Sequence, residues 1–361
     1  MDDLTIARWR MHTLRLAGEP FASPTAAVGG LLGVQAENHP QASWAVAART
    51  RGATEDEFQR LFDAGQILRT HVLRPTWHFV LPADIRWLVE LTGPRIRPQL
   101  RQVQRSAGID DAMLEHSAAV IVDVLSGGTH LTRDELAARL RDAGITTDNG
   151  RLGVHVYHAE TAALICSGAM KGTDHTYALL DERAPAAPRL DRDEAVAELV
   201  RRYFTGHGPA TERDLSYWAS MTLTDIRAGL AAAGDQLDRV EHDGRTFWFA
   251  DPPLSTDPAL NPRAHLLQIL DEYHNGYQDS RGVLDIAGIV PPGRPANLGM
   301  ALVDAQMVGG MRRTLRTGHV SFDINLFRDL DPDEHAALQA AAARYADFLG
   351  RDTTLTDVER T

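Results

Sequence analysis

Gln35 and Glu37 are the residues whose types and spacing come closest to a chemical function in this sequence. A carboxylate can stabilise the positive charge that builds on a sugar while an N-glycosidic bond breaks, and it can orient or deprotonate the attacking water. An amide such as that of Gln35 can position the water or the departing base. The same pair is also common as a solvated or capping pair at a helix end, so the spacing alone leaves both interpretations open.

The position of Pro40 predicts how this pair is presented. Residues i and i+2 of a continuous helix do not share a face. Pro40 disfavours helical geometry at His39 and suits the first turn of a following helix. We therefore predict that a helix ends around Glu37 or Asn38, where an irregular junction lets both side chains point into one cavity.

Arginines are the candidate contacts to phosphate. The arginines that gather locally are Arg69 and Arg74, then Arg95, Arg97, Arg101 and Arg105 within eleven residues that contain no acid, and finally Arg312, Arg313 and Arg316. Such clusters can bind phosphate oxygens, and they can equally be solvated faces of helices or strands.

Two other features have an ordinary structural interpretation beside a chemical one. His155, His158 and Glu160 could place three metal ligands near one face of a predicted helix, but polar neighbours on a partly buried helix give the same pattern. We predict no metal site. Cys166 lies in an apolar run, which favours a buried structural thiol.

The bulk composition indicates several soluble domains. The chain has 361 residues, of which 43% are hydrophobic and 24% are charged, and its single cysteine excludes an intramolecular disulfide. It contains no apolar run long enough to span a bilayer and does not begin like a signal peptide, so we expect a cytoplasmic protein without a membrane partner. The net charge of −12 argues against nucleic-acid binding unless the basic residues are segregated on one face.

An order of three helices followed by a hairpin recurs along the chain. In the clearest copy, helices are predicted from Asp193, Thr211 and Thr222, and the turn Asp243-Gly244 joins two short strands. In the copy before it, Thr132 and Glu135 form a predicted capping box at the start of the second helix. This order is the winged-helix plan, in which the third helix can enter a major groove.

These patterns predict an α+β protein made of three tandem winged-helix (helix-turn-helix) units around a C-terminal small β-barrel. The predicted units are residues 1–105, which contain the Gln-x-Glu pair, residues 110–184, residues 190–252, and residues 260–361 for the barrel and a final helix. Proline-containing segments at 185–188 and 252–262 are predicted linkers. The barrel strands are expected at 300–303, 306–315 and 319–327.

The sequence resembles the winged-helix DNA glycosylases of the AlkZ/YcaQ type over nearly its whole length. The segments that carry the resemblance are LLGVQAE at 31–37, RPTWH at 74–78, LICSG at 164–168, HTYALLDER at 175–183, GPAT at 208–211 with Trp218, TLTD at 222–225, and LDEY at 270–273 with Gly276-Tyr277. The motif of this family is Gln-x-Gln or Gln-x-Asp. The matching residues here are Gln35 and Glu37, so this chain has a carboxylate one methylene longer than Asp.

The resemblance implies a concave channel for duplex DNA, formed by the winged helices around the barrel. It also implies excision of bulky or cationic N7-alkylated purines, in DNA repair or self-resistance, without a cofactor. Trp77, His78 and Asn38 are then predicted to line the lesion pocket, and His71 could line it as well. The alternative is that His71 and His78 pack or bond locally. The arginine clusters become the predicted contacts to DNA.

Lys171 is relevant to whether a glycosylase of this kind also cleaves the DNA strand. An enzyme that also cleaves the strand needs an amine to form a Schiff base. Apart from the N-terminus, the single lysine is the only such amine, and it lies in a predicted hairpin turn far along the chain from Gln35. We therefore predict a monofunctional glycosylase that leaves an abasic site. We expect a monomer associated with the nucleoid.

Two other classes of function remain open. A non-catalytic winged-helix DNA-binding protein, such as a regulator or a damage sensor, would share the fold and bind DNA without releasing a base. A protein-interaction scaffold would also fit the charge of −12. Base release distinguishes the enzyme from the regulator, and salt-dependent DNA binding distinguishes both from the scaffold.

Overall fold

One order of elements recurs in the structure: a helix, a short strand, two helices and a hairpin, with the strand reduced to a single bridge in the third copy. The computed structural model describes residues 2–252, 260–293 and 298–358. The first copy consists of α2 (Pro24–Leu31), β1 (Val34–Gln35), α3 (His39–Ala47), α4 (Glu55–Asp63), β2 (Leu68–His71) and β3 (Trp77–Val80). Helix α1 (Asp3–Thr13) precedes it, and α5 (Pro82–Ile96), η1 (Arg97–Leu100) and α6 (Arg101–Ser106) follow it.

The second and third copies repeat this order. The second consists of α7 (Asp111–Leu125), β4 (Leu131–Thr132), α8 (Arg133–Asp142), α9 (Arg151–Thr161), β5 (Ile165–Ser167) and β6 (Thr176–Leu179), followed by α10 (Leu180–Arg183). The third consists of α11 (Arg192–His207), α12 (Glu212–Ala219), α13 (Leu223–Ala233), η2 (Gly234–Gln236), β7 (Asp238–His242) and β8 (Arg245–Phe249). The sheet orders β1-β3-β2 and β4-β6-β5 are equivalent, and a bridge from Ala210 to Trp248 takes the place of the first strand in the third copy.

Capping boxes begin several of these helices, as the sequence predicts. The side chain of Thr132 accepts from the Glu135 N–H while Glu135 accepts from the Thr132 N–H, and α8 starts there. Thr211 and Asp214 do the same at α12. Each box satisfies two backbone donors that a helix start otherwise leaves unpaired, so these boundaries are set locally.

The C-terminal sheet is open. Its strands are β9 (Ala264–Leu267), β10 (Gly299–Val303), β11 (Gln306–Arg316), β12 (His319–Leu326) and β13 (Asp352–Val358), and α15 (Pro332–Leu349) precedes the last of them. The order is β13-β12-β11-β10-β9, and α15 contacts both edge strands. The predicted barrel is therefore a half-barrel whose one face is covered by a helix. The sequence prediction included β10 to β12 and α15 but missed β9 and β13.

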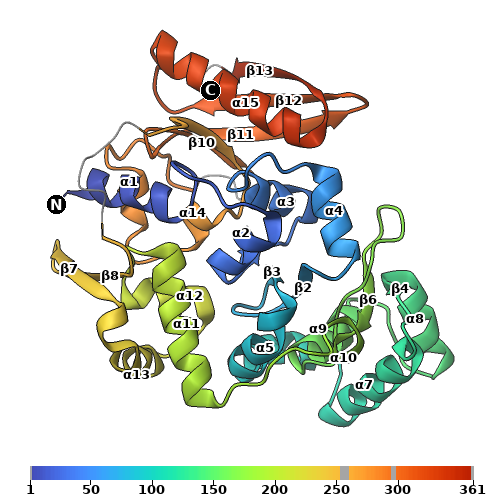
Figure 1. Cartoon of the computed structure of the whole chain (residues 1–361). Coiled ribbons are helices and arrows are strands. Elements are labelled where there is room, and N and C mark those ends of the chain that lie inside the picture. The colour runs from blue at the N-terminus through green and yellow to red at the C-terminus, as the bar shows by residue number, and fades with distance from the viewer. Residues whose placement is uncertain (1, 253–259, 294–297, 359–361) are drawn as a thin grey trace.

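Figure 1 shows how these parts are arranged. The half-barrel lies at the top of the view, the first copy lies below it, and the second and third copies lie at the lower right and lower left. Two short elements, α14 (Glu272–Asn275) and η3 (Arg281–Leu284), connect β9 to β10. Most of the predicted linker at 252–262 falls on residues 253–259, which lie outside the described residues. None of the described helices is long and apolar enough to cross a membrane.

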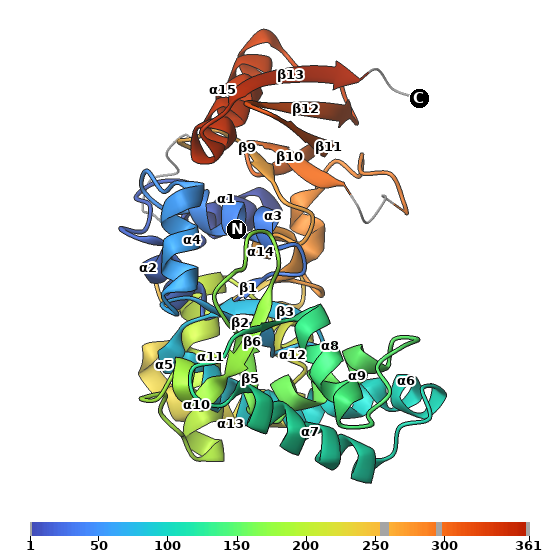
Figure 2. The same cartoon turned by 90° about the vertical axis from the view of Figure 1, so that its right-hand side faces the viewer.

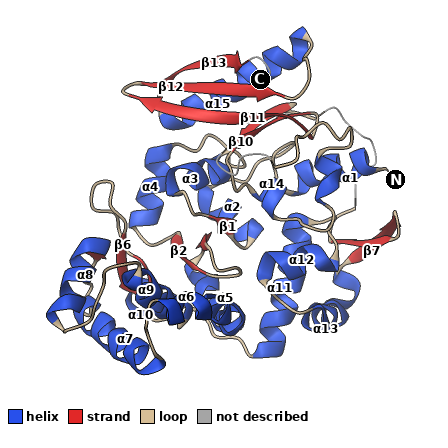
Figure 3. Cartoon of the chain, turned by 180° about the vertical axis from the view of Figure 1, so that it is seen from behind, coloured by secondary structure: helices blue, strands red, loops and turns tan. Residues whose placement is uncertain are grey.

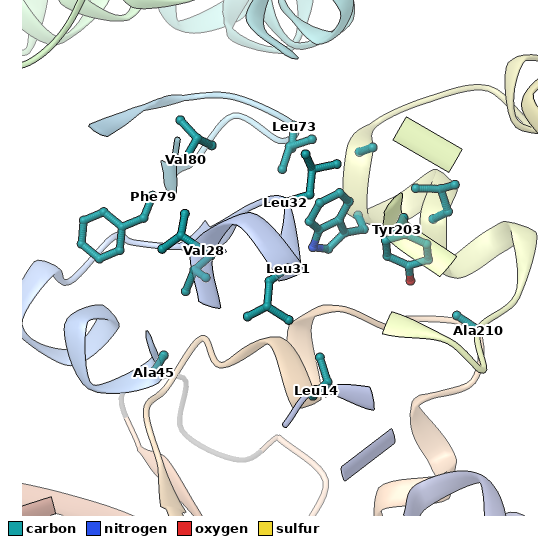
Figure 4. Packing of buried hydrophobic residues seen from close by; sticks show 14 of the residues in the cluster. Leu14, Val28, Leu31, Leu32, Ala45, Leu73, Phe79, Val80, Tyr203 and Ala210 are labelled. Atoms are coloured by element: carbon teal, nitrogen blue, oxygen red, sulfur yellow. The ribbon is translucent and has the colours of Figure 1, made fainter. Parts of the chain in front are cut away.

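The first and third copies share one core. Leu31 and Leu32 are fully buried, and Figure 4 shows them between Phe79 of the first copy and Tyr203 of the third. Burial of each such leucine contributes about 1.5–3 kcal/mol. Close helix contact is possible because Gly206 lies on α11, where a Cβ would be 2.4 Å from the backbone oxygen of the facing α2 residue. The first and third copies therefore form one packed body.

The second copy has a core of its own. Its buried residues include Ile121, Leu136 and Ile165, and these form a separate hydrophobic cluster. It joins the first copy where β5 contacts β2 and where α9 contacts α5. Figure 3 shows the second copy as a separate group of helices beside α5.

The helix predicted through Gln35 is wrong. Helix α2 ends at Leu31, and β1 pairs with β3 in antiparallel register, with Gln35 opposite His78. Leu32 has a φ of 63°, which costs a non-glycine residue roughly 1–2 kcal/mol and turns the chain out of the helix. Short apolar runs do not distinguish a buried strand from a helix by periodicity, which explains the error. Pro40 does lie in the first turn of α3, as predicted.

We predict that Asp271→Ala destabilises the protein by about 3–5 kcal/mol. Asp271 and Arg49 form a buried two-point ion pair, with distances of 3.0 and 2.6 Å, and the substitution leaves the guanidinium without a counter-charge. Urea unfolding measures the loss. Glu19→Ala removes a carboxylate from an exposed pair with Arg51 and should cost less than about 1 kcal/mol. Equal losses in the two variants would contradict this prediction.

Candidate active site

Gln35 is held at both ends by residues from distant parts of the chain. Its backbone N–H donates to Oε1 of Glu272 at 2.9 Å. Its side-chain oxygen accepts from Nη2 of Arg74 at 2.6 Å and from Nδ2 of Asn275 at 3.0 Å. Because a guanidinium only donates, the amide oxygen must face Arg74. The side-chain NH2 of Gln35 is thus left as a donor that can bind a substrate or a water.

Glu272 holds the backbone of Gln35. Its carboxylate is fully buried, and each of its two oxygens accepts a hydrogen bond. Its Oε2 accepts from Nε1 of Trp218 at 2.8 Å and lies 3.4 Å from Nε2 of His207. Burial by itself would raise the pKa of Glu272, but the nearby side chains of His207 and Arg74 lower it to about 2. Glu272 therefore remains an anion that fixes the backbone at Gln35.

Glu37 lies just after β1 and its side chain is half-buried. Its Oε1 accepts from the backbone N–H of Trp77 at 2.7 Å. Nε and Nη2 of Arg69 donate to the backbone oxygens of Ala36 and Glu37 at 2.8 and 3.3 Å. The guanidinium carbon of Arg69 also lies 4.3 Å from the centre of the Trp77 ring. Glu37 is thus a partly exposed carboxylate on a firmly held backbone.

A second carboxylate reaches the same tryptophan from the second copy. Glu160 on α9 is 1% exposed, and it accepts from Nε1 of Trp77 at 3.2 Å. Its other oxygen is paired with Nδ1 of His71, whose ring centre lies 4.2 Å from that of Trp77. Trp77 therefore contacts Glu37 through its backbone and Glu160 through its indole.

Glu160 is not part of a metal site with its sequence neighbours. Nδ1 of His155 bonds to Oγ of Ser117 at 2.8 Å, away from the Glu160 contacts. Within the described residues, no group of three or more His, Cys, Asp or Glu side chains is arranged to hold a metal. Cys166 is buried as predicted, and burial raises the pKa of its thiol to about 12.

His78 and Asn38, predicted to line a lesion pocket, have local roles in the structure. His78 is fully buried, and its Nδ1 lies 3.1 Å from the backbone oxygen of Thr76. Burial, reinforced by Arg74, lowers the pKa of His78 to about 3, so its ring is neutral. Asn38 is exposed and caps α3 by accepting from the Gln41 N–H at 3.2 Å.

The predicted DNA-contacting arginines fall into two groups. Arg69 and Arg74 are buried and bind protein oxygens around Glu37 and Gln35, so they organise the site from inside. The others lie at or near the surface: Arg95, Arg97 and Arg101 near the end of α5 and the start of α6, and Arg312 and Arg313 on β11. Figure 2 shows α6 and β11 toward opposite ends of the molecule.

The surface arginines differ in how freely they are presented. Arg101 and Arg312 are exposed, and Arg97 is half-buried. Nη1 of Arg313 donates to the Tyr345 hydroxyl at 2.7 Å, which holds it against α15. Nε of Arg95 contacts the backbone oxygen of Ser220 at 3.3 Å.

Sequence reasoning missed the residues that hold Gln35. Glu272 and Asn275 lie more than 230 positions away from it along the chain. No local spacing connects residues so far apart. The segment LDEY at 270–273, which contains Glu272, is one of those that carry the family resemblance, and it was the available signal.

The fold agrees with comparisons to known proteins. The family model for DNA glycosylase AlkZ-like proteins matches residues 28–348. The chain therefore belongs to the AlkZ-like DNA glycosylase family. Membership of this family supports a DNA glycosylase function in DNA repair. Its fold is similar to that of Streptomyces sahachiroi DNA glycosylase AlkZ, with a TM-score of 0.79 and 21% identity over 98% of this chain and 99% of that one. No curated protein sequence matches.

We predict that Glu272→Gln lowers stability in a pH-dependent way. The folded-state pKa of Glu272 is about 2 against an ordinary value of 4.5, so its stabilising contribution is fully present above pH 4.5 and is lost as the pH falls toward 2. The variant should therefore be less stable than the wild type at pH 7, and the difference should shrink below pH 4.5. Urea unfolding between pH 7 and 3 measures this, and a difference that stays constant would contradict it.

Proposed function

We propose that this protein hydrolyses the N-glycosidic bond of N7-alkylated purines in duplex DNA, for DNA repair or self-resistance. The observation that carries the proposal is the half-buried carboxylate of Glu37, held by the Trp77 N–H two residues after the clamped amide of Gln35. A site with an anion and a free amide donor suits a reaction whose transition state is a sugar cation.

The chemistry follows from the charge of the substrate. When the C1′–N9 bond breaks, its electron pair goes to a purine that is already cationic, so no acid is required for the leaving group. Glu37 stabilises the positive charge left on the sugar, and it orients or deprotonates the water that adds to C1′. The NH2 group of Gln35 donates to the water or to the base. A single carboxylate is sufficient for this sequence of steps.

We further propose that the three repeated units are tandem winged helices, assigned to residues 1–105, 110–184 and 190–252. The equivalent sheet orders β1-β3-β2 and β4-β6-β5 support this, because the hairpin follows the third helix and pairs with a strand placed before the second. We assign residues 260–361 to the half-barrel and the final helix. Helices α4, α9 and α13 occupy the position of a recognition helix.

The reaction we propose is monofunctional and needs no cofactor. Nζ of Lys171 is engaged by both carboxylate oxygens of Glu135 at 2.9 and 2.7 Å. These contacts belong to the second copy, whereas Gln35 lies in the first. The single lysine is therefore poorly placed to form a Schiff base at the sugar. The product is an abasic site in an otherwise intact strand.

We predict that Glu37→Ala slows release of N7-methylguanine from duplex DNA by at least about 100-fold, because it removes the charge opposite the sugar cation. Single-turnover assays with alkali treatment measure the release, and without alkali the strand should remain uncleaved. Duplex affinity, measured by fluorescence anisotropy, should be unchanged. Glu37→Gln keeps an oxygen that can accept from the Trp77 N–H but removes the negative charge. Comparing it with Glu37→Ala therefore distinguishes the effect of the charge from the effect of the hydrogen bond.

Glu90→Ala is the matched control, since it removes a half-buried carboxylate paired with Arg189 outside the site. It should release the base at the wild-type rate. If the wild type binds the duplex but releases no base, the protein is the non-catalytic DNA-binding alternative. If no salt-dependent binding occurs at all, both DNA functions are excluded.

We predict that removal of surface arginines weakens DNA binding uniformly across sequences. Arg101→Ala and Arg312→Ala should each reduce the slope of log K against log salt by about 0.9, the value for one lost phosphate contact. Arg189→Ala, which removes an exposed arginine outside both clusters, should leave the slope unchanged. Titrations at several salt concentrations measure the slopes. A reduction that is as large for Arg189→Ala would contradict the assignment.

A further inference from the structure

His71 and Glu160 form a polar pair, joined to Glu37 through Trp77, that the reaction described above does not use. Glu160 is buried, and its two oxygens are taken by Nδ1 of His71 and Nε1 of Trp77. The same Trp77 donates its backbone N–H to Glu37. One tryptophan thus connects the histidine–carboxylate pair to the proposed catalytic carboxylate.

In this pair, the ring nitrogen Nε2 of His71 is available to contact a substrate. Glu160 occupies Nδ1, and within the described residues Nε2 of His71 has no hydrogen-bond partner. The side chain keeps 11% of its surface exposed, so this nitrogen is reachable from solvent. A carboxylate behind Nδ1 fixes the ring orientation and leaves Nε2 for proton transfer.

Glu160 is a buried carboxylate whose nearest basic group is His71. A buried carboxylate is costly unless a positive charge compensates it. Arg69 lies over the Trp77 ring and donates to the backbone oxygens of Ala36 and Glu37, and no hydrogen bond joins it to Glu160 in the described part of the chain. When His71 is protonated it is therefore the direct counter-ion of Glu160, and its Nε2–H is then a donor for the substrate.

We propose that His71 is a general acid for the leaving base, which extends the substrate class to purine lesions that carry no positive charge. This inference rests on the proposed glycosylase function. A cationic purine departs as a neutral base without help, whereas an uncharged purine would depart as an anion. Protonation of the departing ring contributes about 10²–10⁴ in rate. Glu160 is the positioning residue, because it acts only through His71.

In the proposed step, the departing base receives one proton from His71 and one electron pair from the broken bond. Nε2 of His71 gives its proton to a ring nitrogen of the purine while the C1′–N9 electron pair passes to the base, which leaves neutral. The imidazole that remains still donates from Nδ1 to Glu160. Water adds to the sugar cation and loses a proton to Glu37. The His71 proton is then restored from solvent.

The groups around His71 come from three elements. Tyr157 and Glu160 face it from α9, with the Tyr157 ring centre 4.8 Å away, Arg69 lies on the same strand, and His78 lies on β3. Burial raises the pKa of Tyr157 and lowers that of His78 to about 3. Neither changes charge between about pH 5.5 and 8.5, the range in which a histidine titrates.

The test compares two lesions that differ in charge, N7-methylguanine and 1,N6-ethenoadenine, in otherwise identical duplexes. The wild type should release both. His71→Asn should slow release of ethenoadenine by about 100-fold or more and change release of N7-methylguanine by less than about threefold. Glu160→Gln should show the same selectivity in weaker form. Wild-type release of ethenoadenine should also fall at high pH, where a general acid loses its proton, while release of N7-methylguanine stays flat.

His116→Asn is the matched control, since it changes an exposed histidine on α7 and should affect neither substrate. Thermal unfolding and duplex affinity of His71→Asn verify that the fold and binding are retained. Release of N7-methylguanine without ethenoadenine by the wild type overturns this inference and leaves the glycosylase intact. Equal slowing of both lesions in His71→Asn also overturns it. Release of neither lesion by the wild type refutes the glycosylase proposal itself.

Discussion

The buried carboxylate of Glu272 is the contact on which the arrangement around Gln35 depends. It accepts from the backbone of β1 and from the indole of Trp218 on α12. It also lies beside the imidazole of His207 at the end of α11. A buried anion is tolerated only when its oxygens are fully satisfied, so these elements must meet at one point. The short helix α14 that carries it is itself fixed at Asp271, which caps the helix and pairs with Arg49. A loop between β9 and β10 thus determines where the first copy presents its amide.

The two carboxylates near Trp77 depend on a different constraint. Glu37 belongs to the body formed by the first and third copies, whereas Glu160 comes from the second copy, which has a separate core. The two bodies meet where β2 contacts β5, and Oγ of Ser167 accepts from the Arg69 N–H at 2.8 Å across that edge. Movement of the second copy would therefore alter the His71–Glu160 geometry and leave Gln35 in place. The candidate site therefore combines residues that belong to both units.

Local chemistry was predictable from the sequence, and long-range pairing was not. The capping box at Thr132 and the Asp243-Gly244 hairpin turn lie where expected, because both depend on residues a few positions apart. The two-residue strand at Gln35 forms because β3 pairs with it, so no pattern in the neighbouring residues predicts it. Glu160 illustrates the same limit. Helical spacing grouped it with His155, but its true partner, His71, lies on a strand of another unit.

Net charge and the buried arginines together constrain how an acidic chain can act on DNA. Arg69 and Arg74 donate to protein oxygens inside the site, so in our proposal the phosphate contacts come from the surface arginines near α6 and on β11. With a net charge of −12, non-specific attraction to the backbone is weak. In the proposed reaction, discrimination then comes from the chemistry at the lesion and not from attraction to the phosphate backbone. In the proposed reaction, the acidity of the chain therefore supports selection of damaged over normal DNA.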